Sequence, residues 1–168
     1  GREVLYEVAD HIAIVTLNRP DKRNAVNGDV AAAMDWIVNE VENSDVRVAI
    51  LTSSLESTFC AGAELSEISK GNAHKLSTKK GGFAGFAKFP RTKPWIAAVR
   101  GNALAGGCEL PLSCDMIVAA DDSRFGLPEV KRGIFAGAGG VFRLPRAIPR
   151  NIALEIVATG DPLPAERL

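Results

Sequence analysis

The stretch "PWIAAVRGNALAGGCELPLSCDMIVAA" (residues 94–120) contains the pattern that decides the fold. Residues 94–99 and 115–120 are short apolar runs that predict buried strands. Between them, two adjacent glycines precede a glutamate and an apolar segment that predicts a helix. Proline is tolerated only in the first turn of a helix, so Pro111 requires this helix to begin near Gly107. A strand, a helix and a second strand in this order are typical of parallel pairing.

The same alternation of strands and helices extends on both sides of this stretch. Residues 11–17 predict a strand, and residues 46–52 predict a strand buried on both faces. A helix is predicted over 29–43, after Asn27 as its N-cap. Its apolar side chains recur with the helical period, at Val30, Ala33, Met34, Ile37, Val38 and Val41.

Three further segments complete this interpretation. A short helix is expected from about Glu64, and another over 149–160, ended by a glycine and a proline. Residues 71–93 are rich in Gly, Lys and Ser and predict a mobile segment, with a short helix possible, and residues 126–140 predict a glycine-rich loop. The fold class predicted is α/β with mainly parallel pairing.

Length and composition indicate a single ordinary globular domain. The chain has 168 residues, of which 46% are hydrophobic and 24% charged. Twenty Lys and Arg balance twenty Asp and Glu, so the formal net charge is zero, which gives no support to nucleic-acid binding. An uncharged apolar stretch of about 18 residues, as a membrane span needs, does not occur. Three cysteines without a CxxC pair favour a reducing compartment, and we expect a cytoplasmic protein.

Two loops of small residues each follow a predicted strand and open a helix: "FCAGAEL" (59–65) and "GNALAGGCEL" (101–110). Ligands of open α/β sheets bind beyond the carboxyl ends of the strands. A helix N-terminus offers free N–H groups, and two such loops side by side would aim two N–H groups at one oxygen, as an oxyanion hole does. The glycines would equally serve tight turns and close packing. Neither loop matches a phosphate-binding motif.

Two carboxylates accompany these loops. Glu109 lies just inside the predicted helix, and Glu129 follows "FGLP" in the next loop. A glutamate in a first helical turn is common for helix-dipole reasons alone, and Glu129 would also suit the surface. Together, near an oxyanion hole, the two would suit acid–base chemistry on a carbon next to a carbonyl group.

Other chemistries receive less support from the sequence. The histidines, His11 and His74, are better explained as structural or exposed, and neither is at ligand spacing from a cysteine, so we predict no metal site. Cys108 lacks an evident histidine base and is better explained as a small packing residue.

Several stretches in this order resemble the crotonase, or enoyl-CoA hydratase, superfamily. They span nearly the whole chain: "NRPDKRNAV" (18–26), "FCAGAEL" (59–65), "GNALAGGCELPLSCDMIVAA" (101–120), "FGLPEVKRGI" (125–134), "GAGGVFRLPRAI" (137–148) and "ATGDPL" (158–163). The resemblance implies a spiral of ββα units that binds acyl-CoA thioesters. It also implies that residues 1–168 form an acyl-CoA-binding core domain, and that C-terminal trimerisation helices of about another 90 residues are absent.

The resemblance assigns roles to individual residues. The N–H groups of Ala63 and Gly106 would hold the thioester oxygen, Glu109 would activate the attacking water, and Glu129 would protonate the α-carbon. The N–H of Gly137 would help to hold that water. The residues expected along the CoA are Lys22, Arg23, Ala25, Val26, Ala61, Ala63, Glu64, Leu65, Ser66 and Gly106.

Retention of both glutamates favours an enoyl-CoA hydratase that adds water to a trans-2-enoyl-CoA, giving a 3-hydroxyacyl-CoA in metabolism of the fatty-acid β-oxidation type. No separate cofactor is expected, since coenzyme A is part of the substrate, and no nucleic acid or membrane partner is expected. A homotrimer or a dimer of trimers is implied. The alternatives are crotonobetainyl-CoA hydration, enoyl-CoA isomerisation, acyl-CoA hydrolysis, or a non-catalytic acyl-CoA-binding module.

Overall fold

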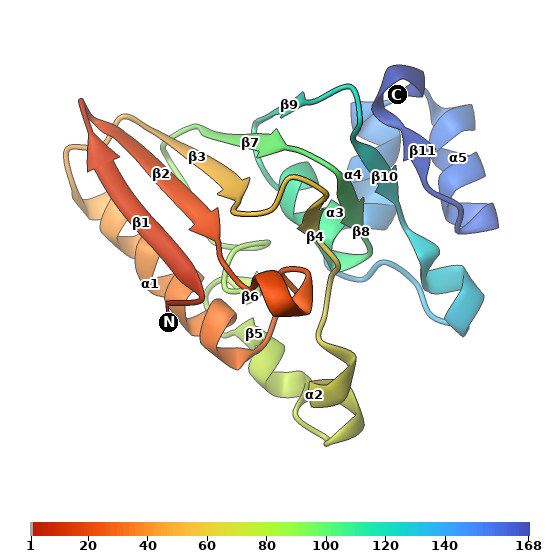
Figure 1. Ribbon diagram of the computed structural model, residues 1–168, viewed down its shortest axis with the longest axis horizontal. Coiled ribbons are helices and arrows are strands. Elements are labelled where there is room, and N and C mark those ends of the chain that lie inside the picture. The colour runs from red at the N-terminus through yellow and green to blue at the C-terminus, as the bar shows by residue number, and fades with distance from the viewer. Residues whose placement is uncertain (1) are drawn as a thin grey trace.

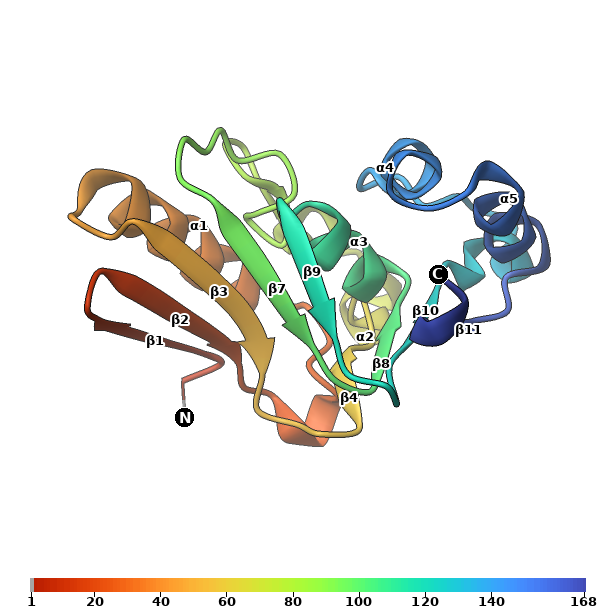
Figure 2. The same cartoon turned by 90° about the horizontal axis from the view of Figure 1, so that it is seen from above.

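A five-stranded sheet with helices on one face forms the main layer of the protein (Figures 1 and 2). The computed structural model describes residues 2–168. The strand order is β1-β2-β3-β7-β9, in which β1 and β2 form an antiparallel hairpin and the remaining neighbours are parallel. The strands are β1 Val4–Ala9, β2 Ile12–Leu17, β3 Val48–Ser53, β7 Trp95–Val99 and β9 Met116–Ala119.

Alternation of side chains across the strands separates a buried face from an open one. In β2, Ala13, Val15 and Leu17 are buried, whereas Ile12 and Ile14 are exposed. The strand predicted over 46–52 follows the same rule, because alternate side chains of β3 are buried and the others half-buried. The prediction that both faces of this strand are buried is therefore wrong. The covering helices lie on only one side of the sheet in the part of the chain described (Figure 2).

The long helix α1 (Gly28–Asn43) packs its apolar stripe against this buried face. Asn27 caps it, as predicted, since its side-chain oxygen accepts from the Val30 N–H at 2.9 Å. Helix α3 (Gly106–Leu112) begins at the predicted glycines, and α5 (Arg150–Thr159) ends at Gly160 in the left-handed conformation. The other short helices are α2 Leu65–Ser69, α4 Gly140–Ala147, η1 Pro20–Lys22, η2 Ala73–Leu76, η3 Pro128–Arg132 and η4 Ala165–Arg167.

A second, smaller sheet, which the sequence did not predict, follows from short pairings between the loops. Its strand order is β11-β10-β8-β4, and a separate two-stranded hairpin joins β5 and β6. The strands are β4 Thr58–Cys60, β5 Ser77–Thr78, β6 Gly82–Phe83, β8 Asn102–Leu104, β10 Arg124–Gly126 and β11 Leu163–Pro164. Strands of two or three residues leave too little periodicity to be recognised in a sequence. This sheet carries the loops that open α2 and α3.

The segment 71–93, predicted to be mobile, is instead packed against the core. Phe86 is fully buried and stacks edge-on against Trp95, with ring centroids 4.9 Å apart. Backbone hydrogen bonds close the segment on itself, from Ala84 N to Leu76 O and from Lys88 N to Gly81 O. Aromatic burial therefore outweighs the Gly, Lys and Ser content from which mobility was predicted. The predicted loop 126–140 likewise contains the 3-10 helix η3.

Candidate active site

The two small-residue loops predicted from the sequence lie against each other at one end of the short sheet. A Cβ atom built on Gly62 would lie only 3.1 Å from the nitrogen of Gly106. A Cβ on Gly106 would lie 2.5 Å from the Phe83 ring, and one on Gly107 would lie 2.0 Å from the Cys60 carbonyl oxygen. A side chain at Gly107 would collide with backbone, and Gly62 has a left-handed φ of +97°, so the close approach of the two loops depends on glycine at these two positions.

Backbone geometry leaves an N–H group available in each loop. Gly106 is the first residue of α3, where an N–H has no acceptor within its own helix. Ala63 forms an isolated parallel bridge with Val26, through bonds from Val26 N to Gly62 O (2.7 Å) and from Glu64 N to Val26 O (2.8 Å). In such a bridge the N–H of Ala63 itself points away from Val26. Both predicted donors thus lie in adjoining loops.

Glu109 is held inside the protein by backbone amides. It is 4% exposed, and its Oε1 accepts from Gly140 N at 2.9 Å. Burial raises the pKa of Glu109 to about 7, and the nearby charge of Glu129 adds to this, against hydrogen bonds from Gly140 and Ala138 and the charge of Arg143, which act in the opposite direction. The carboxyl group therefore changes its protonation state near neutral pH.

Glu129 faces the same region from η3. It is 9% exposed, and burial raises its pKa, against a lowering hydrogen bond from its own backbone N–H. Among the residues that the structure describes, its Oε1 finds no hydrogen-bond partner. Burying an unpaired polar atom costs free energy, and such atoms are often found where a functional site requires them. The charge of Glu129 raises the pKa of Glu109, so the two predicted carboxyl groups lie close enough to interact electrostatically.

A cavity of about 440 Å³ lies close to the Gly106 loop and to the turn that holds Glu109. It is bounded by Phe83, which contacts Gly106, and by Ala138, whose amide holds Glu109. Gly137 also lines it. A second, apolar cavity of about 430 Å³ lies between α3, β9 and α4, and neither glutamate is among the described residues that line it. Neither glutamate lines the first cavity either, but this cavity approaches Glu109 through Ala138 and Gly106 through Phe83.

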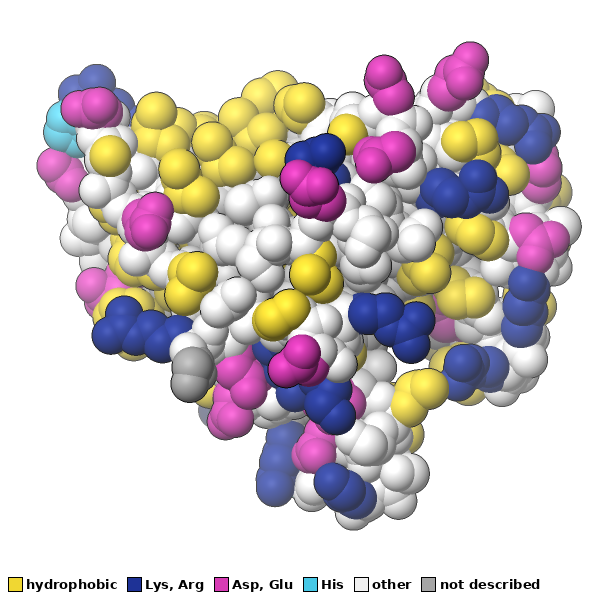
Figure 3. Space-filling model, viewed as in Figure 1, with side chains coloured by type: hydrophobic (Ala, Val, Ile, Leu, Met, Phe, Trp, Pro, Cys, Tyr) yellow, Lys and Arg dark blue, Asp and Glu magenta, His cyan; other side chains and the backbone are white. Residues whose placement is uncertain are grey.

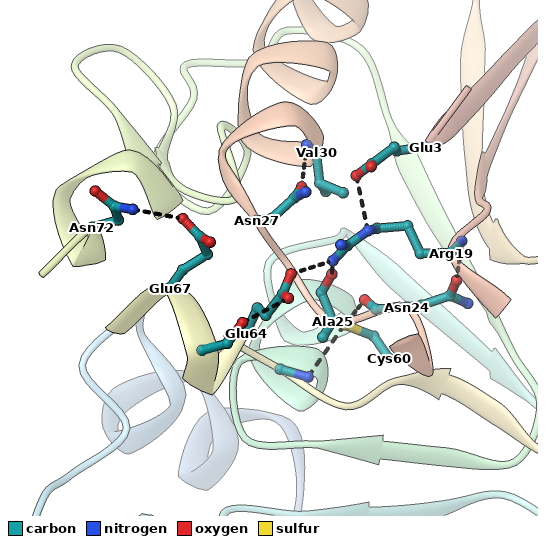
Figure 4. Close-up of polar contacts among 12 residues, drawn as sticks. Glu3, Arg19, Asn24, Ala25, Asn27, Val30, Cys60, Glu64, Glu67 and Asn72 are labelled. Carbon is teal, nitrogen blue, oxygen red and sulfur yellow. Dashed lines mark hydrogen bonds and ion pairs between the residues drawn. The ribbon is translucent and has the colours of Figure 1, made fainter. Parts of the chain in front are cut away.

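The segment expected to run along CoA lies beside the Ala63 loop. Ala61 N donates to Arg23 O at 3.0 Å, and Asn24, buried, donates to the Phe59 carbonyl. Arg19 connects the two segments: its Nη1 donates to the Ala25 carbonyl oxygen and, at 2.8 Å, to Glu64 Oε2 (Figure 4).

This network limits what the predicted CoA-binding residues can offer. Glu64 is engaged by Arg19 and by the Ser66 hydroxyl, and these bonds hold its pKa below the ordinary value against the effect of burial. Val26 is fully buried in the core, and its N–H and C=O are both used by the bridge. Lys22, Arg23, Leu65 and Ser66 are exposed. A ligand would therefore meet exposed side chains and the backbone of this surface, rather than the side chain of Val26.

Sequence reasoning missed several residues of the site. Gly140, Ala138 and Arg143 surround Glu109, and Phe83 lies on Gly106. Ala138, Gly140 and Arg143 all lie in the motif "GAGGVFRLPRAI" (137–148). A linear pattern, however, does not indicate which backbone amide donates a hydrogen bond to which carboxylate.

Comparison with known proteins identifies the family of this chain. The sequence matches the enoyl-CoA hydratase/isomerase family over residues 7–168. The chain belongs to this family. It is similar to the short-chain-enoyl-CoA hydratase of Clostridium acetobutylicum, with 41% identity over 168 residues, covering 97% of this chain and 64% of that protein. A carnitinyl-CoA dehydratase of Salmonella enteritidis is 43% identical over 154 residues, covering 90% of this chain and 59% of that protein.

Solved structures of this family confirm the crotonase fold. The enoyl-CoA hydratase from Mycobacterium tuberculosis H37Rv superimposes with a TM-score of 0.93 at 49% identity, covering 99% of this chain and 65% of that one. The carnitinyl-CoA hydratase from Mycobacterium avium gives a TM-score of 0.91 at 43% identity, with the same coverage. The chain thus spans 59–65% of the length of these relatives.

Two further findings concern the described residues. Within residues 2–168, no helix combines the length and the apolar character that crossing a membrane requires. Nor do three or more His, Cys, Asp or Glu side chains within that range gather as a metal site would need.

Proposed function

We propose that this protein is an enoyl-CoA hydratase, which adds water to the α,β double bond of a trans-2-enoyl-CoA and yields a 3-hydroxyacyl-CoA. The observation that carries the proposal is the buried pair Glu109 and Glu129, with raised pKa values, beside two adjoining loops with available N–H groups. Family membership and the similarity to hydratases support it.

In the proposed reaction the thioester carbonyl oxygen binds the N–H groups of Ala63 and Gly106. Glu109, ionised, takes a proton from a water molecule whose oxygen bonds to the β-carbon. The electrons of the double bond move toward the carbonyl oxygen, and the resulting enolate charge is stabilised by the two N–H groups. A pKa of about 7 suits Glu109 to this role, because the ideal base titrates near the working pH.

Glu129 completes the proposed reaction as the acid. Its raised pKa favours the protonated form, and its unpaired Oε1 leaves an atom free to face substrate. Transfer of its proton to the α-carbon collapses the enolate and leaves the neutral 3-hydroxyacyl thioester. The proton taken up by Glu109 then returns to Glu129 through solvent, so that one water is consumed per turnover. Gly137, which lines the cavity, is proposed to hold that water through its N–H.

The thioester and the amides supply the electronic stabilisation in this scheme, so we propose no separate metal or redox cofactor. The CoA is proposed to lie along the exposed residues Lys22, Arg23, Leu65 and Ser66. A cytoplasmic location remains part of the proposal.

We also propose that the protein works as a homotrimer or a dimer of trimers. An apolar face supports self-association: the open side of the five-stranded sheet carries exposed Ile12, Ile14, Met116 and Val118. Figure 3 shows hydrophobic side chains gathered over this sheet, at the top of the view. Continuous apolar surface of this kind is typical of protein–protein contacts.

The direct test is an assay with crotonyl-CoA, whose conjugated absorbance is lost on hydration. We expect the wild-type protein to give a product heavier by one water, and Glu109→Gln and Glu129→Gln to lose this activity. Glu166→Gln, a change at an exposed carboxylate, is the matched control. Wild-type rates in both active-site variants would contradict the proposal. Product mass distinguishes the alternatives: isomerisation leaves the mass unchanged, hydrolysis releases CoA, and a non-catalytic module returns the ligand intact.

A further inference from the structure

Arg143 of α4 reaches three separate segments around the proposed site. Its Nη1 donates to the Ser113 hydroxyl at 3.0 Å and to the Ala138 carbonyl at 3.2 Å, and its Nη2 donates to the Ala87 carbonyl at 2.8 Å. These acceptors belong to the end of α3, the turn before α4 and the segment that lines the cavity. A planar guanidinium with five N–H donors is suited to joining several acceptors in one plane.

Each contact leads back to Glu109 or to the cavity. The Ser113 hydroxyl donates to the Glu109 carbonyl oxygen at 2.7 Å. The turn held at Ala138 presents the amides of Ala138 and Gly140 to the Glu109 carboxyl group. Ala87 and Ala138 both line the 440 Å³ cavity. The Arg143 side chain is therefore linked to the backbone of Glu109 through Ser113, to its carboxyl group through the turn at Ala138, and to two residues that line the cavity, Ala87 and Ala138.

The turn is also shaped to receive this side chain. A Cβ built on Gly139 would lie 2.4 Å from Arg143 Nη1, and Gly139 has a φ of +111°. Arg91 also reaches the end of α3, donating to the carbonyls of Phe86 and Ser113. Burial lowers the pKa of both arginines, which shows that their placement has a desolvation cost.

The charged and titratable groups near Glu109 come from three elements. Glu129 of η3 raises its pKa, and Arg143 of α4 lowers it. Cys108, next to Glu109 in α3, is fully buried, and its pKa is raised beyond the ordinary range by burial and by both glutamates, so it stays a neutral thiol. Arg143 is thus the cation that offsets Glu129.

We propose that Arg143 is a positioning residue, which fixes the Glu109 carboxyl group against the turn at residues 138–140. The role in turnover rests on the proposed hydratase function. Arg143 touches neither substrate nor reacting atoms in this scheme, and it acts only through Glu109 and the cavity walls.

The test compares Arg143→Met and Arg143→Lys with Arg146→Met, which removes an exposed arginine of the same helix. The first measurement is a carbon-13 NMR titration of the Glu109 carboxyl group in protein labelled at the glutamate side chain, assigned with Glu109→Gln. We expect the titration midpoint to move to higher pH in Arg143→Met, to move less in Arg143→Lys because the charge is kept, and to stay at the wild-type value in Arg146→Met.

The second measurement is the pH dependence of crotonyl-CoA hydration. We expect kcat of Arg143→Met at pH 7 to fall by roughly 10- to 100-fold, as a small displacement of a reacting group does, with a smaller change in KM and an acid limb at higher pH. An unchanged Glu109 midpoint in folded Arg143→Met overturns the inference. Absence of hydration by wild type, with the NMR shift intact, would instead refute only the proposed function.

Discussion

Replacing Glu109 with glutamine should make the protein more stable while abolishing its proposed activity. The reason is that burial penalises the charged carboxylate. Below pH 4.5 the carboxyl group is protonated in both the folded and the unfolded chain. Above that pH the unfolded chain ionises first, because the pKa in the folded protein is raised to about 7. Stability is therefore lost as the pH rises from 4.5 to about 7, and glutamine removes this loss.

The size of the effect follows from the displacement of the pKa. A rise from 4.5 to about 7 corresponds to about 3 kcal/mol at roughly 1.4 kcal/mol per unit. Glu109 is only 4% exposed, so solvent screening reduces this little. Between pH 5 and pH 8 the advantage of the glutamine variant over wild type should grow by about 2 kcal/mol. Part of the gain at either pH is lost because a neutral amide accepts weaker hydrogen bonds from the Gly140 and Ala138 N–H groups than a carboxylate does.

The assay is urea-induced unfolding of wild type and Glu109→Gln at pH 5 and pH 8. The change in the free-energy difference between the two pH values reports the ionisation of Glu109 together with its coupling to Glu129, whose charge acts on Glu109. Glu166→Gln, at an exposed position, should show no such dependence. A Glu109→Gln advantage that is constant from pH 5 to pH 8, or that shrinks, would refute the argument that burial sets the pKa of this residue.

Two further substitutions test the packing around the site. Gly107→Ala should destabilise the protein by about 2 kcal/mol or more in urea unfolding, because its Cβ would meet the Cys60 carbonyl oxygen at 2.0 Å. Gly28→Ala, with its nearest neighbour at 3.3 Å, is the control, and equal losses would contradict this reasoning. Phe83→Ala should enlarge the cavity and raise kcat/KM for longer enoyl chains relative to crotonyl-CoA, and an unchanged ratio across a chain-length panel would exclude Phe83 as a cavity wall.

The longer elements were predictable because each has a local cause. The helix α1 has an N-cap and an apolar stripe that repeats with the helical period, and the strands β2, β7 and β9 are apolar runs of ordinary length. The hairpin partner β1 and the helix α4 were not predicted. In α4, Pro145 and the glycines before it argue locally against a helix, yet packing of Leu144 into the core stabilises one.

The candidate site was predicted in its components, but their arrangement was not. Gly106, Glu109 and Glu129 were singled out because small residues at a helix start and paired carboxylates suggest a particular chemistry. That the carboxyl groups interact, and that Glu109 receives the amides of Gly140 and Ala138, became clear only from the fold. The contact partners of Glu109 are about 30 residues away in sequence. Separations of that size leave no periodic trace.

The sequence by itself determined the fold class, the family and the identity of the two carboxylates, because hydrophobic period, glycine placement and motif order are properties of neighbouring residues. Only the tertiary structure decided that 71–93 packs as a wall of the site, that β3 has one open face, and that Arg143 joins α3, the turn before α4 and the cavity. The physical reason is that burial and charge depend on what surrounds a group in three dimensions. The pKa of Glu109, ordinary in the unfolded chain, rises to about 7 when the fold buries its carboxyl group.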